Sequence, residues 1–457
     1  MSSTQTVATV KQPEAYMPVY PKFTPEMKST HKILIPQMAP IHFEMIAAAM
    51  RQDGYRIEVL ENGGPEVAQE GLKYVHNDTC YPALLVIGQF IDALKSGKYD
   101  LDHTALMITQ TGGGCRASNY IHLLRKALVK AGFPQVPVAS LNFSGLEKDS
   151  GFKYTLPLIR KAIAGVFYGD ELMSLSNQLR PYENTPGSTD ALVKKWQQEI
   201  CTQFESGKGV NKREMKKNFE AIADDFALLP VTKVPRVKVG IVGEIYVKYS
   251  PLGNSHLEDF LASEGCEVNM PSLMGFIQYC IVNGSVNIEL YGGSKLVKTV
   301  YERVMDFTTV REKLMVNAIA RHPNLHAPTL FEETKKLANG FIGYGAKMGE
   351  GWLLTAEMVE LVQSGFPNIV CAQPFGCLPN HVVGKAMISK IRAVHPEANI
   401  TPIDYDPSAT KVNQENRIKL MLAVGKERLE DTKKGLTAPP KLDSLPTSNI
   451  QLSNSAI

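Results

Sequence analysis

Short apolar runs alternate with helix-length segments along most of the 457 residues, and this alternation constrains the fold more than any other feature. The runs are rich in aliphatic and β-branched residues, as in strands that are buried on both faces. Strands alternating with helices of this length are typical of a parallel sheet covered by helices on both sides. The strands expected on this basis are residues 32–35, 55–60, 104–109, 135–141, 238–247, 267–270, 369–372 and 399–403.

The expected strands form two groups, which predicts two α/β domains joined by a helical connector. The main helices expected within the two domains are 40–50, 81–96, 118–131, 254–264, 295–320, 328–340, 352–364, 380–395 and 411–428. We therefore expect an extended N-terminal arm (1–30), a first α/β domain that binds the metal (31–150), a helical connector (151–235), a second α/β domain (236–428), and a disordered tail (429–457) rich in Pro, Ser, Thr and Lys.

The composition excludes several classes of protein. It is 44% hydrophobic and 21% charged with a net charge of +3, which is ordinary for a globular protein and shows no concentrated basic stripe for nucleic acid. No apolar run approaches the roughly 20 residues that span a bilayer, and the N-terminus lacks the apolar segment of a signal peptide. Seven scattered cysteines are too sparse for a secreted disulfide framework. We expect a cytoplasmic protein without membrane or nucleic-acid partners.

Three cysteines lie in loops with the same local pattern. Cys80, Cys115 and Cys377 each precede a segment expected to be helical, and the last two also follow an apolar strand-like run. A thiol at a helix N-terminus meets unpaired backbone N–H groups and the positive end of the helix dipole, which favour the thiolate that binds metal. Gly113 and Gly114 would let the backbone approach an inorganic core and donate hydrogen bonds to sulfide. The pattern suggests one thiolate cage, most plausibly for iron and sulfur.

The remaining cysteines are weaker candidates. Taken alone, each loop thiol is equally consistent with a small buried hydrophobe. Cys371, six residues before Cys377 on a strand, is either a fourth ligand or a residue that points into the sheet. Three others are expected in the core: Cys201, Cys266 and Cys280. Zinc is the rival metal, but zinc sites usually contain close cysteine pairs, and this chain has none with that spacing.

Other motifs add two candidate catalytic residues and exclude a nucleotide site. No complete phosphate loop or dinucleotide fingerprint occurs. Glu244, at the end of an expected strand, either contacts a ligand or orients its loop. His381, close to Cys377, either acts near the metal or is a bystander beside a capping Asn380. The string Gly349-Glu350-Gly351-Trp352 predicts a helix start with the tryptophan as a packing anchor.

The cysteine loops resemble a known family. NDTCYPALLVIGQF, ITQTGGGCRASNYI and CAQPFGCLPNHVVGKAM, followed by PIDYDPSATKVNQENRIKLML, are similar to the acyl-CoA dehydratase activase-related proteins of the 2-hydroxyacyl-CoA dehydratase (D-component) superfamily. The resemblance covers about residues 31–428. It implies two Rossmann-like domains that hold a four-iron four-sulfur (4Fe-4S) cluster between them through Cys80, Cys115 and Cys377, with Cys371 as a candidate fourth ligand.

The resemblance also implies partners. In the superfamily, a separate ATP-binding activase of the sugar kinase/actin fold supplies one low-potential electron, and the dehydratase works with a second dehydratase-like subunit or as a homodimer. The first hypothesis is therefore an iron–sulfur protein that uses this electron to reduce or dehydrate a substrate, with a CoA thioester as the analogy. The alternatives are a non-catalytic electron-transfer or scaffold subunit with a fully ligated cluster, and a zinc or metal-free structural protein.

Overall fold

The computed structural model describes residues 20–76, 78–111, 114–142 and 151–434. It contains two four-stranded parallel sheets in a mixed α/β fold, as the alternation predicts. Most of the expected arm and nearly all of the expected tail lie outside the described residues, as do Asn77 and Gly113. Within the described ranges, none of the helices combines the length and apolar character needed to cross a membrane.

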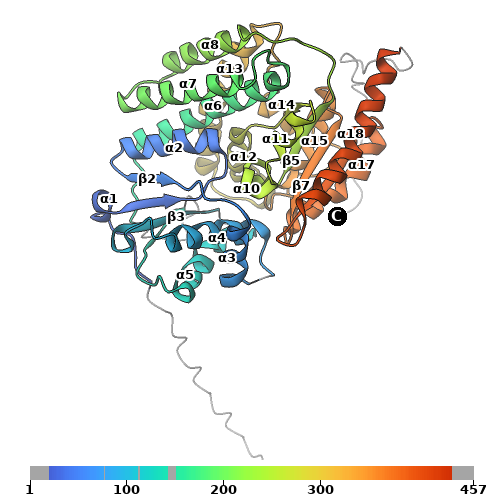
Figure 1. Ribbon diagram of the computed structural model, residues 1–457. Coiled ribbons are helices and arrows are strands. Elements are labelled where there is room, and N and C mark those ends of the chain that lie inside the picture. The colour runs from blue at the N-terminus through green and yellow to red at the C-terminus, as the bar shows by residue number, and fades with distance from the viewer. Residues whose placement is uncertain (1–19, 77, 112–113, 143–150, 435–457) are drawn as a thin grey trace, which may run out of the picture.

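The first sheet has the strand order β2-β1-β3-β4, and all of its neighbouring pairs are parallel. Helix α2 lies on one side of this sheet, and α3, α4 and α5 lie on the other (Figure 1). The elements are β1 (Lys32–Ile35), α2 (Pro40–Gln52), β2 (Arg56–Val59), α3 (Pro65–Tyr74), α4 (Tyr81–Lys95), β3 (Thr104–Gln110), α5 (Tyr120–Ala131) and β4 (Val138–Asn142).

The second sheet repeats this order as β6-β5-β7-β8, again entirely parallel. Its strands are β5 (Lys238–Gly243), β6 (Glu267–Asn269), β7 (Asn368–Pro374) and β8 (Asn399–Tyr405). Its helices are α9 (Ile245–Tyr249), α10 (Pro251–Asn254), α11 (Leu257–Ser263), α12 (Leu273–Tyr291), α13 (Lys295–Ala320), α14 (Phe331–Lys336), α15 (Gly351–Gln363), α16 (Leu378–Val383), α17 (Ile388–Val394) and α18 (Lys411–Lys433).

Three long helices connect the sheets: α6 (Leu156–Leu179), α7 (Ser188–Glu205) and α8 (Lys212–Ala227). The connector is therefore helical, as expected. Nearly every side chain of α6 after Ala164 is buried, and this helix packs against both α2 and α12. One apolar cluster runs from the first sheet through the connector to β5 and β6, while a second lies between β7 and α15. The shared core makes the two sheets parts of one folded body.

Several expected boundaries differ from the observed ones. The strand expected over 238–247 ends at Gly243, because Glu244 caps the short helix α9. Gly243 has φ +149°, and a Cβ there would collide with the Ala372 carbonyl oxygen. The helix expected over 380–395 breaks at Gly384. The last helix continues to Lys433, five residues into the expected tail.

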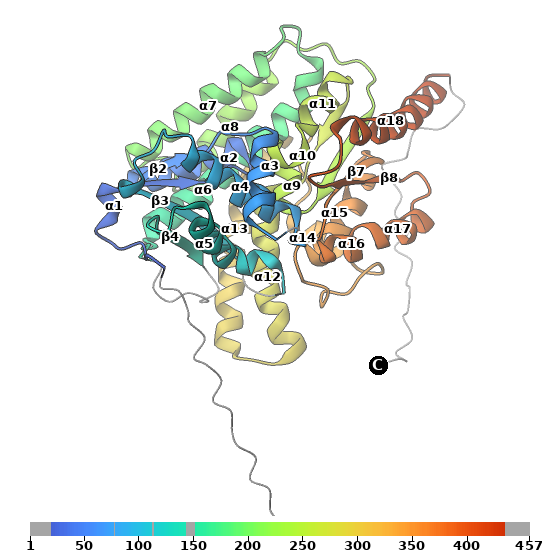
Figure 2. The same cartoon turned by 60° about the horizontal axis from the view of Figure 1, so that its bottom comes forward.

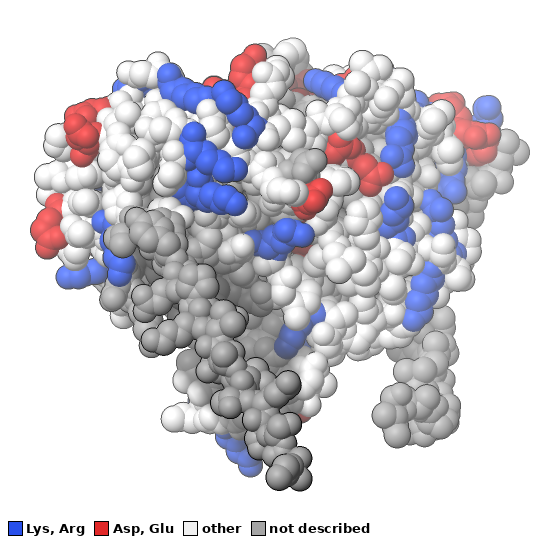
Figure 3. All heavy atoms as spheres, turned by 90° about the horizontal axis from the view of Figure 1, so that it is seen from below, with Lys and Arg blue, Asp and Glu red and all other residues white. Residues whose placement is uncertain are grey.

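Two more features matter below. Helices α12 and α13 form a hairpin that extends beyond the folded body (Figure 2). On the face seen from below, positive and negative side chains are both scattered among uncharged residues (Figure 3).

Candidate metal centre

All three loop cysteines occupy the N-cap position of a helix. Cys80 caps α4, Cys377 caps α16, and Cys115 caps the short 3-10 helix 116–119 that leads into α5. All three have the extended backbone conformation of an N-cap residue. Cys115 follows β3 and Cys377 follows β7, which occupy equivalent places in the two sheets. The local prediction for these loops is confirmed.

The loops of Cys80 and Cys377 touch, although they belong to different halves. The Tyr81 N–H donates a 3.0 Å hydrogen bond to the Phe375 carbonyl oxygen. Gly376 has φ +75°, and a Cβ at that position would lie 3.1 Å from the Cys80 Cα. A glycine is required there both by its backbone conformation and by this close approach.

The Cys115 loop also contacts the second half of the molecule. The Gly114 N–H lies 3.3 Å from the Met348 Sδ, which ties this loop of the first half to the second half. The Tyr120 hydroxyl, on the first residue of α5, lies 2.9 Å from the Cys80 Sγ. Charge on Cys80 raises the pKa of Cys115, and charge on Cys115 raises that of Cys377. Cys115 is therefore within electrostatic range of both Cys80 and Cys377.

The thiol pKa values run against the expectation from helix dipoles. Burial raises the pKa of Cys80, raises that of Cys115 to about 11, and raises that of Cys377 as well. The carboxyls of Glu350 and Glu244 add to the shift at Cys115 and Cys377. Desolvation outweighs the helix N-termini, so the protein groups alone favour neutral thiols. A bound metal would reverse this preference, because its positive charge stabilises thiolate.

Two glutamates, the buried Glu350 and the half-buried Glu244, act electrostatically on the thiols. The Glu244 Oε2 accepts from the Val247 N–H at 2.9 Å, and burial together with the charge of Glu350 raises the pKa of Glu244 to about 8. The Glu350 Oε1 accepts from the Ile245 N–H at 2.9 Å, and its Oε2 accepts from the Asn380 Nδ2 at 3.2 Å. Because Asn380 lies on α16, Glu350 links the start of α9 to the helix that Cys377 caps.

Glu350 was not recognised as a site residue from the sequence. The string around it was interpreted as a helix start with a tryptophan anchor, and Trp352 is indeed fully buried. The missed signal was the glutamate between two glycines that both adopt positive φ. A carboxyl on such a turn can be buried easily, because the glycine on each side of it has no side chain that must be buried as well.

The other two candidate site residues are Cys371 and His381, and their surroundings differ from those of the three loop cysteines. Cys371 is fully buried in the apolar cluster with Val242 and Leu354, and the groups that act on its pKa after burial are Asp404 and two glutamates rather than the loop thiols. His381 is half-buried on α16, and its backbone N–H donates to the Cys377 carbonyl oxygen at 3.3 Å.

The three cysteines expected in the core have mixed outcomes. Cys266 is buried in the main core, as predicted. Cys201 is half-buried against that core. Cys280 is exposed, so its prediction is wrong. The FIQYC segment is apolar, but the projecting hairpin leaves one side of its helix uncovered.

The thiols do not form a site for one ion. Within the residues that the structure describes, no three His, Cys, Asp or Glu side chains are close enough to hold a single metal ion. A single zinc requires every sulfur to approach one point at about 2.3 Å. In a multi-iron cluster each thiolate binds a different iron, so the sulfurs can be farther apart. Thiolates are the ligands that iron–sulfur clusters use, so the chemistry of the three N-cap cysteines is compatible with such a cluster.

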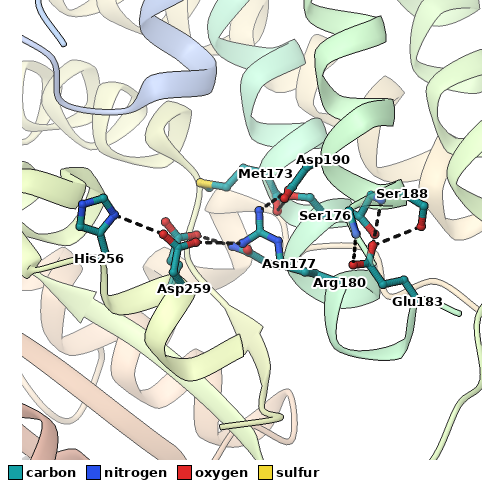
Figure 4. A network of polar contacts seen from close by, with 12 residues as sticks. Met173, Ser176, Asn177, Arg180, Glu183, Ser188, Asp190, His256 and Asp259 are labelled. Atoms are coloured by element: carbon teal, nitrogen blue, oxygen red, sulfur yellow. Dashed lines mark hydrogen bonds and ion pairs between the residues drawn. The ribbon is translucent and has the colours of Figure 1, made fainter. Parts of the chain in front are cut away.

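A cavity of about 310 Å³ lies between the C-terminal part of α6, the start of α2 and residues 249–259, and none of the three loop cysteines lines it. Figure 4 shows Arg180, which directly follows α6, between Asp190 and Asp259, and His256 on the far side of Asp259. The buried His42 lines this cavity, and its Nε2 lies 2.9 Å from the Asp170 Oδ1. No local sequence pattern marks this cavity, because its walls come from segments that are distant in the chain.

Comparison with models of known protein families and with curated proteins finds no match to this chain. The candidate metal centre is therefore described by its own geometry: three N-cap cysteines, the buried Glu350 and the half-buried Glu244.

Proposed function

We propose that the chain is an iron–sulfur protein of the 2-hydroxyacyl-CoA dehydratase type, in which Cys80, Cys115 and Cys377 hold a 4Fe-4S cluster between two Rossmann-like halves. The observation that carries this proposal is the meeting of three N-cap cysteines, two from one half and one from the other. The reversal of strand order beside β1 and β5 also supports it, because open α/β sheets bind ligands at that point.

The residues around the thiols suit such a cofactor. A bound cluster would store an electron and, at an iron without a protein ligand, act as a Lewis acid. The Tyr120 hydroxyl is placed to donate to the Cys80 sulfur, which would tune the reduction potential. Glu244, with a pKa of about 8, holds a proton at neutral pH and could donate it to a substrate oxygen.

The position of Cys371 favours a reacting site over a simple electron carrier. Its side chain is enclosed by aliphatic residues, so only three cysteines are gathered at the loops. Three ligands leave one iron of a four-iron cluster for substrate. We propose that a separate ATP-dependent activase delivers the electron and that the substrate is a small 2-hydroxyacyl thioester.

Anaerobic purification, iron and sulfide analysis, and EPR after dithionite reduction test the proposal. We expect about four irons and four sulfides per chain. Cys115→Ala should abolish the EPR signal while the circular dichroism spectrum is retained. Cys280→Ala, which removes an exposed thiol, is the matched control and should keep the signal. A well-folded anaerobic preparation without iron would exclude the proposal.

A further inference from the structure

The far end of the α12–α13 hairpin, residues 286–306, is here called the arm. It projects from the folded body (Figure 2) and is unusually apolar for a surface segment. Six of its aliphatic or aromatic side chains are 39 to 76% exposed. They are Leu290, Tyr291, Leu296, Val297, Val300 and Val304. An apolar patch of this kind on a projecting element is typical of an interaction surface.

The exposed residues of α13 form a stripe along one side of the helix. Leu296, Val300 and Val304 are spaced four residues apart, and Val297 lies beside them. Side chains at this spacing form a ridge that packs into the groove of another helix. At 1.5 Å rise per residue the ridge is about 12 Å long, so it runs along the helix rather than being confined to the tip.

The charges of the arm are balanced within it. Lys298 lies 2.8 Å from Glu289 and 3.8 Å from Glu302, and Arg303 lies 3.8 Å from Asp306. With Lys295, the arm has three basic and three acidic residues and no net charge. This neutrality argues against nucleic acid, an anionic membrane or a strongly charged protein. It also removes the like-charge repulsion that two identical surfaces would otherwise meet.

The two helices of the arm pack against each other within the single chain. The Tyr301 ring packs directly on Gly284, where any Cβ would collide with it. This contact brings α12 and α13 close together, so the apolar ridge is presented on a preformed surface. Little conformational entropy would be lost when a second helical pair packs on it.

We propose that two copies of the chain associate through their arms, with the stripe of one arm packed against the same stripe of the other about a twofold axis. Such a contact is self-complementary because the surface is apolar in its centre and neutral in its charges. The contact does not depend on the cluster, and it assigns an interaction surface to a part of the chain far in sequence from the cysteine loops.

The test is the solution mass of the full chain, measured by sedimentation equilibrium between about 1 and 100 µM. The wild-type protein should have twice the mass of one chain. Leu296→Glu/Val300→Glu should weaken association at least about 100-fold and give the mass of one chain, because each glutamate would be buried in the apolar contact. The matched control is Leu228→Glu/Leu420→Glu, which adds the same charges at two exposed leucines elsewhere and should remain a dimer.

Unchanged thermal unfolding of the arm variant would show that it is folded, since its substituted residues are exposed. A wild-type mass of one chain throughout the range, or an arm variant that remains a dimer, would overturn the proposal. The wild-type protein could instead sediment together with phosphatidylcholine vesicles while the arm variant does not. That result would also overturn the proposal, because it would identify a membrane as the partner of the arm.

Discussion

At the residue scale, the carboxyls of this chain show how burial and hydrogen bonding compete. At Glu244 and Glu350, burial raises the pKa and outweighs the opposing effects of backbone hydrogen bonds and of the Lys248 charge. Glu58, at the surface, shows the opposite balance. Burial alone raises its pKa, but hydrogen bonds from Lys32, Lys98 and Tyr99 outweigh that effect and lower the pKa to about 2.

The Glu58 network should make stability depend on pH. The folded-state pKa of about 2 lies below the usual 4.5, so the network stabilises the fold above pH 4.5 and loses its effect as the pH falls toward 2. Glu58→Gln should cost up to about 1 kcal/mol at pH 7, a modest value because the group is open to solvent. Urea unfolding at pH 7 and pH 2.5 measures this cost. An equal cost at both pH values would contradict the prediction.

At the element scale, the cysteine centre depends on how closely two loops approach. The Cys377 loop turns at Gly376, which has positive φ and lies against the backbone of Cys80. The Cys80 loop is fixed in turn by its hydrogen bond to Phe375. A side chain at the turn would therefore push apart two loops that must both face the same centre.

Gly376→Ala should lower the free energy of unfolding by about 1–3 kcal/mol and reduce the iron bound per chain, because the strained φ and the close contact both oppose a Cβ. Gly365→Ala is the matched control. Its glycine has φ +83°, but a Cβ there meets open space among the described atoms. The control should lose only about 1 kcal/mol and keep its iron. Equal iron contents in the two variants would show that the loop contact is not required.

At the scale of the whole molecule, Asp170 joins three parts of the chain. From the connector helix α6, its Oδ1 lies 2.9 Å from the His42 Nε2 and accepts from the Leu273 N–H at 2.7 Å. Its Oδ2 accepts from the Met274 N–H at 2.9 Å. The carboxylate thus binds the first α/β half and caps the helix that begins the hairpin. These hydrogen bonds join the same two halves of the molecule that the shared apolar core joins.

Asp170→Ala should lower the free energy of unfolding by about 3 kcal/mol or more, since it leaves a buried histidine and two helix N–H groups without their partner. Asp190→Ala removes a carboxylate of the same kind from an exposed pair with Arg180, and it should cost less than about 1 kcal/mol. Chemical denaturation of the two variants under identical conditions makes the comparison. Similar losses would mean that the Asp170 network does not stabilise the assembly of the halves.

A feature of this structure can be predicted from the sequence when residues close in the chain determine it. The strands and the helix-start cysteines were predictable because they depend on neighbours a few residues away, such as the apolar runs before Cys115 and Cys377. The end of β5 was missed because Gly243 turns the chain for a tertiary reason, its contact with Ala372. Cys280 was misplaced because local hydrophobicity does not reveal which side of a helix another element covers.

The sequence by itself determined the two α/β halves, the helical connector and the position of each loop cysteine at a helix N-terminus, because periodicity and capping are local properties. Only the tertiary structure decided that the Cys80 and Cys377 loops touch, that Glu244 and Glu350 flank the thiols, that Cys371 lies in the apolar core and that the arm stands exposed. These features depend on contacts between segments far apart in the chain, and on the burial that follows from those contacts.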